Sequence, residues 1–176
     1  MKYVALLRGI NVGGKTRVEM PRLKQTFEDL GFTDVKTYIN SGNVIFASKG
    51  KPSASKIETA IEKEFGFAVP VVLRSMQQIK ALLDSFPTTW VNDATMKCDV
   101  MFLWDEIDSP SIMQQIPYKP EIEDVLYVPG AVIWRIDRDK VSRGAVLKIV
   151  GTDAYKKMTI RNPNTVRKLY ELMNTI

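Results

Sequence analysis

The sequence predicts an α+β protein made of two tandem ferredoxin-like halves, each with split βαβ order and antiparallel hairpins. Three observations predict this fold. Within the first 75 residues, apolar runs and amphipathic stretches follow the order strand, helix, strand, strand, helix, strand. Turn-forming residues at 40–43 and at Pro129-Gly130 each separate two β-rich runs. The second half repeats the order imperfectly, so the predicted division lies between residues 1–76 and a degenerate half, residues 77–176.

The first half opens with an apolar run at residues 2–8, which predicts a buried strand, and continues as a glycine-bearing polar loop to residue 19. A helix is expected to start near Met20-Pro21, because proline is preorganised for a first helical position. Gly31 is expected to end this helix. Its apolar stripe recurs every three or four residues, at Met20, Leu23, Phe27 and Leu30.

The rest of the first half is predicted to be a hairpin, a helix and a strand. Residues 34–39 and 44–47 are β-rich and flank the turn. Ser55 and Glu58 predict a capping box for the following helix, which ends at Gly66. Residues 69–73 predict the closing strand.

The second half is expected to contain a helix at 75–86, a polar linker at 88–97, a strand at 98–104, a short helix at 109–116, a hairpin at 124–136, a short helix at 142–150 and a last helix at 164–176. Asn162 or Asn164 is a suitable N-cap for the last helix, because asparagine side chains accept from the first helical amides.

Composition is that of an ordinary globular protein and excludes several kinds of chemistry. The chain has 176 residues, 45% of them hydrophobic, and no apolar run of the about 20 residues that a membrane span requires. The absence of histidine excludes Ser-His and Cys-His nucleophile pairs and His-ligated zinc. With a single cysteine, a reducing cytoplasm is the expected location. Cys98 opens an apolar strand and is expected to be a buried hydrophobe.

Charge is unevenly distributed along the chain. Residues 1–83 carry a net charge of +6, residues 84–139 of −7 and residues 140–176 of +6. If the two basic ends meet in the fold, they form a basic face suited to phosphate-bearing partners, including nucleic acid. The alternative is that these lysines are solvated helix faces, and the sequence contains no RNA-stacking motif.

Residues 9–16 satisfy the phosphate-binding pattern G-x-x-x-x-G-K-[ST], in which Lys15 would contact phosphate oxygens and Thr16 would hold Mg²⁺. Residues 100–105 form an apolar run ending in aspartate, as the second element of such a nucleotide site does. Two observations disfavour a P-loop. Its helix would begin at the Lys-Thr pair, which would place Pro21 in the second turn. The predicted hairpins are antiparallel, whereas P-loop sheets are parallel.

Two further polar clusters have both a functional and a structural interpretation. Residues 37–43 place Tyr38, Ser41 and Asn43 near a hairpin tip, although Asn, Ser and Gly are also what such a turn requires. Residues 159–165 precede the last helix. They offer an anion site at a helix N-terminus with Arg161 as a bidentate clamp, or else simple N-capping beside a surface arginine.

These clusters together give the sequence a family resemblance. Four segments carry it: YVALLRGINVGGK, MPRLKQTFEDLGFTDVKTYINSGNVIF, VVLRS and MTIRNPNTVRKLYELM. They closely resemble the family called domain of unknown function 1697, over residues 3–173. The resemblance implies a cytoplasmic, mainly bacterial α+β protein with ferredoxin-like halves and no assigned activity or catalytic residues. The sequence departs from the family at Pro163, where tryptophan is common, and the family does not reserve the position of Lys15 for lysine.

The polar motif positions of the family fall here on Arg8, Asn11, Gly13, Gly14, Tyr38, Ser41, Gly42, Asn43, Arg74, Arg161, Asn162 and Thr165. We hypothesise that the three segments converge on one pocket for an anionic or phosphate-bearing small molecule, since loops carrying such groups are where sites usually lie. Its candidate ligand-binding residues are Arg8, Asn11, Gly13, Gly14, Lys15, Tyr38, Ser41, Asn43, Arg161, Asn162 and Thr165.

Other interpretations stay open at this point. The same polar groups could satisfy one another and lock the structure. A nucleic-acid-binding module and a protein-interaction or assembly module are alternative functions. The residues point to no metal site and no particular cofactor. They decide neither the oligomeric state nor whether the protein is an enzyme.

Overall fold

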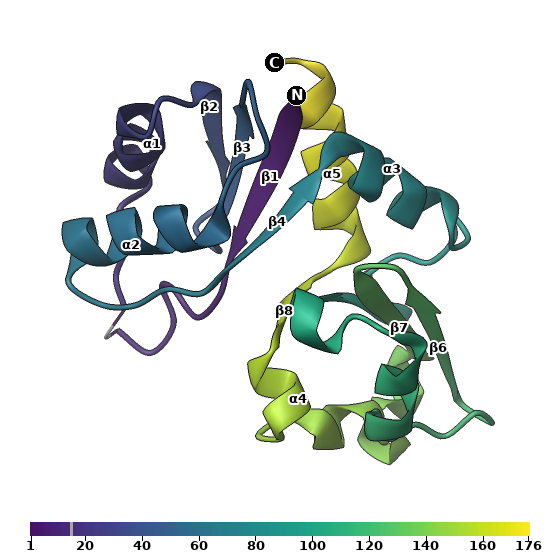
Figure 1. The fold of residues 1–176 in the computed structure, drawn as a ribbon. Coiled ribbons are helices and arrows are strands. Elements are labelled where there is room, and N and C mark those ends of the chain that lie inside the picture. Colours follow the sequence, from purple (N-terminus) through teal and green to yellow (C-terminus); the bar gives the residue numbers. More distant parts are fainter. Residues whose placement is uncertain (15) are drawn as a thin grey trace. The chain divides into compact units, whose positions relative to one another are not determined.

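The structure, a computed structural model, describes residues 1–14 and 16–176. These residues divide into two compact units, one made of residues 1–79 and 168–176 and the other of residues 80–167. Figure 1 shows the helices and strands of both. Among the described residues, none of the helices combines the length and the apolar character that crossing a membrane requires.

The first unit contains a four-stranded antiparallel sheet in the order β2-β3-β1-β4, with helices α1 and α2 on one face (Figure 1). Its elements are β1 (Lys2–Leu7), α1 (Met20–Asp29), β2 (Thr33–Tyr38), β3 (Asn43–Ala47), α2 (Ala54–Phe65), β4 (Val71–Ser75), the start of α3 (Met76–Asp84) and the C-terminal part of α5 (Pro163–Asn174). This is the predicted split βαβ order, and every strand pair with a register is antiparallel.

The second unit has the same strand order, β6-β7-β5-β8, again antiparallel. Its strands are β5 (Met96–Leu103), β6 (Glu123–Val128), β7 (Ala131–Asp137) and β8 (Met158–Arg161). The crossover connections are short: 3₁₀ turns at Asp105–Ile107, Pro110–Gln115, Arg138–Arg143 and Val146–Ile149, and helix α4 (Asp153–Lys156). The α+β fold with two tandem split βαβ sheets is therefore confirmed, and the second sheet is degenerate only in its connections.

Two buried arginines mark the internal repeat. Arg74 in β4 lies opposite Val4 of β1, and Arg161 in β8 lies opposite Val100 of β5. Both arginines are buried, and each donates from Nη1 over 2.8 Å to the carbonyl of the residue that precedes it. The two side chains therefore occupy equivalent places in the two sheets.

The core of the first unit follows from strand alternation. Successive side chains of β1 face opposite sides of the sheet. Tyr3, Ala5 and Leu7 lie on the side covered by the helices, in one buried cluster with Leu23 and Phe27 of α1. These two helical residues are four positions apart, as the apolar stripe predicts. The stripe that starts the helix at Met20 therefore also fixes where the preceding loop must end.

Three local predictions are corrected by the structure. Ser53, rather than Ser55, caps α2 by accepting from the amide of Lys56 over 3.4 Å, so the predicted capping box is wrong. Glu58 accepts instead from the amide of Val71 over 2.8 Å and ties α2 to β4. The short helices expected at 109–116 and 142–150 are 3₁₀ turns, and β8 was not predicted as a strand.

Candidate functional site

The side chain of Asn11 holds the glycine loop (residues 8–14 and 16–19) to the β2–β3 hairpin. Its Nδ2 donates to the main-chain carbonyls of Val18, over 3.1 Å, and of Asn40, over 2.8 Å. Its Oδ1 accepts from the amide of Val18 over 2.9 Å. Both amide hydrogens and the oxygen are thus engaged. Asn11 builds the site, and it brings two of the three predicted clusters together within the first unit.

Gly42 lets the hairpin turn lie directly on the end of β1. Its φ of +81° is in the left-handed region, and its carbonyl accepts from the amide of Leu7 over 2.8 Å. A Cβ at this position would lie 2.7 Å from Cβ of Leu7 and 2.8 Å from Cδ1 of Ile10. Only glycine fits so close an approach without displacing its neighbours.

The predicted hairpin residues are largely engaged with one another. Asn43 is fully buried and donates from Nδ2 to the carbonyl of Tyr38 and to Oγ of Ser41, at 3.0 Å each. Tyr38 is partly buried at the end of β2, opposite Asn43. The structural interpretation of Asn43 is therefore favoured over direct ligand contact.

Gly13 and Gly14 form the exposed apex of the glycine loop. Their φ values are +64° and +74°, and a Cβ on either would meet nothing within 4 Å. Their main chain is therefore accessible to a ligand. Arg8, at the start of the loop, donates its amide to the carbonyl of Pro70 over 3.0 Å. The predicted phosphate contact Lys15 lies outside the described residues.

The local geometry of the glycine loop differs from that of a P-loop. Oγ1 of Thr16, which would hold Mg²⁺ in that motif, donates to the carbonyl of Gly9 over 2.8 Å. Helix α1 begins at Met20, four residues after Thr16. The strand that precedes the loop pairs antiparallel on both sides. The pattern in the sequence is therefore matched without the strand-loop-helix arrangement that gives it its chemistry.

A cavity of about 400 Å³ opens where the glycine loop, the hairpin tip and the start of α1 meet. It is lined by Asn11, Arg17, Val18, Glu19, Met20, Pro21 and Asn40. Only Asn11 belongs to the predicted ligand-binding set. The others escaped prediction because they are ordinary loop and helix-start residues, which the hydrogen bond between Asn11 and Asn40 brings together.

The polar groups of this cavity include Arg17, Glu19 and Asn40. Arg17 is exposed and lies 3.8 Å from Glu19, an ion pair that solvent weakens. Glu19 occupies the N-cap of α1 without a side-chain cap, and the first turn contains no acidic residue. The amides that open α1 are therefore available to an acceptor, and the helix dipole adds to their pull. The side chain of Asn40 has no hydrogen-bond partner among the described residues.

The third predicted cluster lies at the junction of β8 and α5. Arg161 is buried, and burial lowers the pKa of its guanidinium to about 10. Its Nη1 donates to Oγ1 of Thr159 over 3.0 Å. Asn162 caps α5, because its Oδ1 accepts from the amide of Thr165 over 2.8 Å. The convergence of this cluster with the other two stays a prediction.

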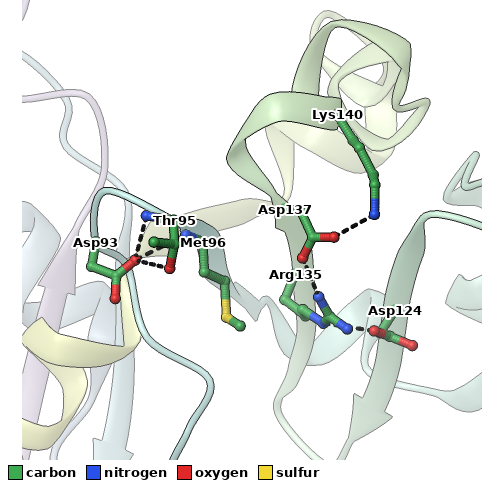
Figure 2. A network of polar contacts seen from close by, with 7 residues as sticks. All are labelled: Asp93, Thr95, Met96, Asp124, Arg135, Asp137 and Lys140. Carbon is green, nitrogen blue, oxygen red and sulfur yellow. Dashed lines mark hydrogen bonds and ion pairs between the residues drawn. The ribbon is translucent and has the colours of Figure 1, made fainter.

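The remaining polar networks of the second unit stabilise its loops (Figure 2). Oδ1 of Asp93 accepts from both the amide and the hydroxyl of Thr95, at 2.8 and 2.9 Å. Arg135 bridges Asp124 and Asp137 across neighbouring strands. Within the part of the chain that the structure describes, no group of three Cys, Asp or Glu side chains is arranged to hold a metal ion.

Comparison with known proteins identifies a family and a fold relative. A family model with the description "Protein of unknown function (DUF1697)" matches residues 1–134. The solved structure of a conserved bacterial protein from Streptococcus pneumoniae is similar, with a TM-score of 0.84 and 29% sequence identity over 98% of both chains. No curated protein matches the sequence.

Proposed function

Because the chain belongs to the family of proteins of unknown function DUF1697, which fixes no activity, we propose a function from the geometry of the site. The protein binds a phosphate-bearing small molecule in the cavity between the glycine loop, the hairpin tip and the start of α1. The observation that carries the proposal is the hydrogen bond from Asn11 to Asn40, which builds a cavity of ligand size from these three segments.

The cavity supplies the contacts that a phosphate requires. Arg17 offers a guanidinium, whose planar donors match phosphate oxygens. The amide of Met20 at the start of α1 adds a neutral donor, whereas Pro21 has no amide hydrogen to contribute. The first unit as a whole carries the net charge of the protein, since it has 13 basic and 8 acidic side chains and the second unit has 12 of each.

Two substitutions of opposite expected effect test the proposal by isothermal titration calorimetry with ribose 5-phosphate. Arg17→Ala removes a charge-assisted hydrogen bond and is expected to weaken binding about tenfold. Glu19→Gln removes the carboxylate that opposes a bound anion and is expected to strengthen binding. Lys51→Ala is the matched control, because Lys51 is an exposed cation of the same unit outside the cavity. Equal affinities in all three variants would contradict the proposal.

The charge of the first unit also favours a second candidate function, nucleic-acid binding. This candidate predicts that the logarithm of affinity falls linearly and steeply with the logarithm of salt concentration. A gel-shift series with short RNA distinguishes the two, because a single phosphate ligand gives a much shallower dependence. An absence of any shift at low salt excludes the nucleic-acid candidate.

A further inference from the structure

Strand β6 forms a regular edge of the second sheet. The strand order β6-β7-β5-β8 places β6 at the end of the sheet, beside β7 alone (Figure 1). The two strands pair without a register shift from Glu123 to Val128 of β6. The residues from Val125 to Val128 carry no charge, and the first three of them are only partly buried. An uncharged edge strand of this kind offers its backbone to another strand.

The strand in the equivalent place of the first sheet is protected against such pairing. β2 lies at the end of the order β2-β3-β1-β4, but its register against β3 shifts between Thr33 and Lys36. Asp34, within this shift, has a φ of +54°. Lys36 is exposed in the middle of the strand. An irregular register and a central lysine are devices that keep sheet edges apart, and β6 has neither between Val125 and Val128.

Backbone hydrogen bonds at the two ends of β7 show which of its residues face β5. At one end, the carbonyl of Gly130 accepts from the amide of Leu103 over 3.0 Å. At the other end, the amide of Arg138 donates to the carbonyl of Thr95 over 2.8 Å. Alternate residues of a strand bond to opposite neighbours, so the even-numbered residues of β7 bond to β5 and the odd-numbered ones bond to β6.

The backbone groups of β6 that point away from β7 follow from this alternation. Leu126 lies opposite an odd-numbered residue of β7 and bonds to it, so the main-chain N–H and C=O groups of Val125 and Tyr127 point outward. The amide of Glu123 belongs to the same outward set, and it donates to the carbonyl of Lys119 over 2.8 Å. Among the residues that the structure describes, the outward groups of Val125 and Tyr127 have no hydrogen-bond partner.

We propose that two copies of the chain associate through β6, in one continuous antiparallel sheet with a two-fold axis at Leu126. In this register Val125 of one copy lies opposite Tyr127 of the other, so that each outward N–H and C=O group gains a partner. Leu126 lies opposite its own copy, on the face away from the core cluster that packs against Val125 and Tyr127. Asp124 lies opposite Val128, so no like charges face each other.

The charges of the two units favour this contact between second units. The second unit has 12 basic and 12 acidic side chains, so two copies of it approach without net repulsion. The first unit has 13 basic and 8 acidic side chains, so two copies of it repel. Because a single strand pair is a small interface, the dimer is expected to be weak, with a dissociation constant between about 1 μM and 1 mM.

Sedimentation equilibrium of the full chain tests this association. The average mass of the wild type is expected to rise with concentration, from that of a monomer towards that of a dimer. Leu126→Lys and Leu126→Glu each place like charges opposite each other at the axis, and each variant is expected to stay monomeric. An equimolar mixture of the two is expected to associate again, because opposite charges then meet. Thr37→Lys, which adds the same charge to β2, is the control and is expected to behave as wild type.

Three results would overturn the proposal. The first is a wild type that stays monomeric up to about 1 mM, the weak end of the expected range. The second is an association that Leu126→Lys does not weaken, which would place the contact on another surface. The third is a mixture of the two variants that stays monomeric although circular dichroism shows both to be folded, which would rule out the register about Leu126.

Amide hydrogen exchange of the wild type tests the same contact without a substitution. Exchange at the amides of Val125 and Tyr127 is expected to slow as the protein concentration rises, because these groups become hydrogen-bonded in the dimer. The amide of Leu126 already bonds to β7 and is expected to exchange slowly at every concentration. Exchange at Val125 and Tyr127 that does not depend on concentration would contradict the pairing.

Discussion

The side-chain amide of Asn11 donates to the main-chain carbonyl of Asn40 over 2.8 Å, across 29 positions of sequence. This contact shows that Asn11 and Asn40 have different structural roles, which the sequence motifs do not distinguish. The side chain of Asn11 makes three hydrogen bonds within the fold, whereas Asn40 contributes only its main-chain carbonyl to this contact. The two asparagines are therefore expected to respond differently to substitution.

Asn11→Ala is expected to lower the free energy of unfolding by about 1–3 kcal/mol, because three hydrogen bonds are lost and alanine must adopt φ +55°. Asn40→Ala is expected to change the free energy of unfolding by less than about 0.5 kcal/mol, because the contact with Asn11 uses only its main-chain carbonyl. Urea unfolding followed by circular dichroism measures both. Similar losses of stability in the two variants would show that this division of roles is wrong.

Gly42→Ala is expected to destabilise the protein strongly, because the added Cβ would lie 2.7 Å from Cβ of Leu7 in a left-handed backbone. Gly13→Ala is the matched control, since it meets the same backbone strain in open space. The control is expected to cost about 1 kcal/mol and Gly42→Ala clearly more. Thermal unfolding of the two variants, run side by side, gives the comparison, and equal losses would contradict the close approach.

Glu123 couples the stability of the second unit to pH. Burial raises the pKa of its carboxyl, but the amides of Ala145, Val146 and Lys119 and the indole of Trp134 together outweigh burial and lower it. A lowered pKa in the folded state stabilises the protein above the unfolded value of about 4.3. This contribution disappears as the pH falls through the folded-state pKa.

Glu123→Gln is therefore expected to cost about 2 kcal/mol at pH 7 and to flatten the loss of stability below pH 4. Urea unfolding between pH 3 and pH 7 measures this, with the exposed neighbour Glu121→Gln as control. A parallel pH dependence in wild type and Glu123→Gln would rule out the carboxylate as its source.

The thiol of Cys98 is expected to be inert in the folded protein. Burial raises its pKa to about 12, so almost no thiolate forms at neutral pH. A thiol-reactive chromogenic disulfide at pH 8 is expected to label Cys98 only after denaturant is added. Rapid labelling of the native protein would contradict the buried position.

The sequence predicts the architecture better than the site. Alternation and amphipathic stripes place most strands and α1, because each pattern reports directly which face is buried. The strand β8 is missed because four residues are too few for their alternation to stand out, and pairing with β5 decides their conformation. Nor does the stripe of the last helix indicate that its C-terminal part belongs to the first unit.

The residues that line the cavity are also hard to predict from the sequence, because tertiary contacts bring them together. Polar motifs indicate the glycine loop and the hairpin, which both border the cavity, yet Asn43 is buried and the side chain of Asn11 is hydrogen-bonded within the fold. Arg17 carries no local signal and Asn40 is indicated only as a turn residue, since the two line one cavity only through tertiary contacts. The motif residue Asn11 therefore shapes the cavity, and in the proposed function its neighbours contact the ligand.

The most direct test of the proposed site is a titration of the ¹⁵N-labelled protein with ribose 5-phosphate, followed by backbone amide chemical shifts. The account predicts that the largest changes occur at Gly13, Gly14, Arg17, Met20 and Asn40, and that Arg17→Ala weakens them while Lys51→Ala does not. Changes confined to residues 159–165, or no changes at millimolar ribose 5-phosphate, would contradict it.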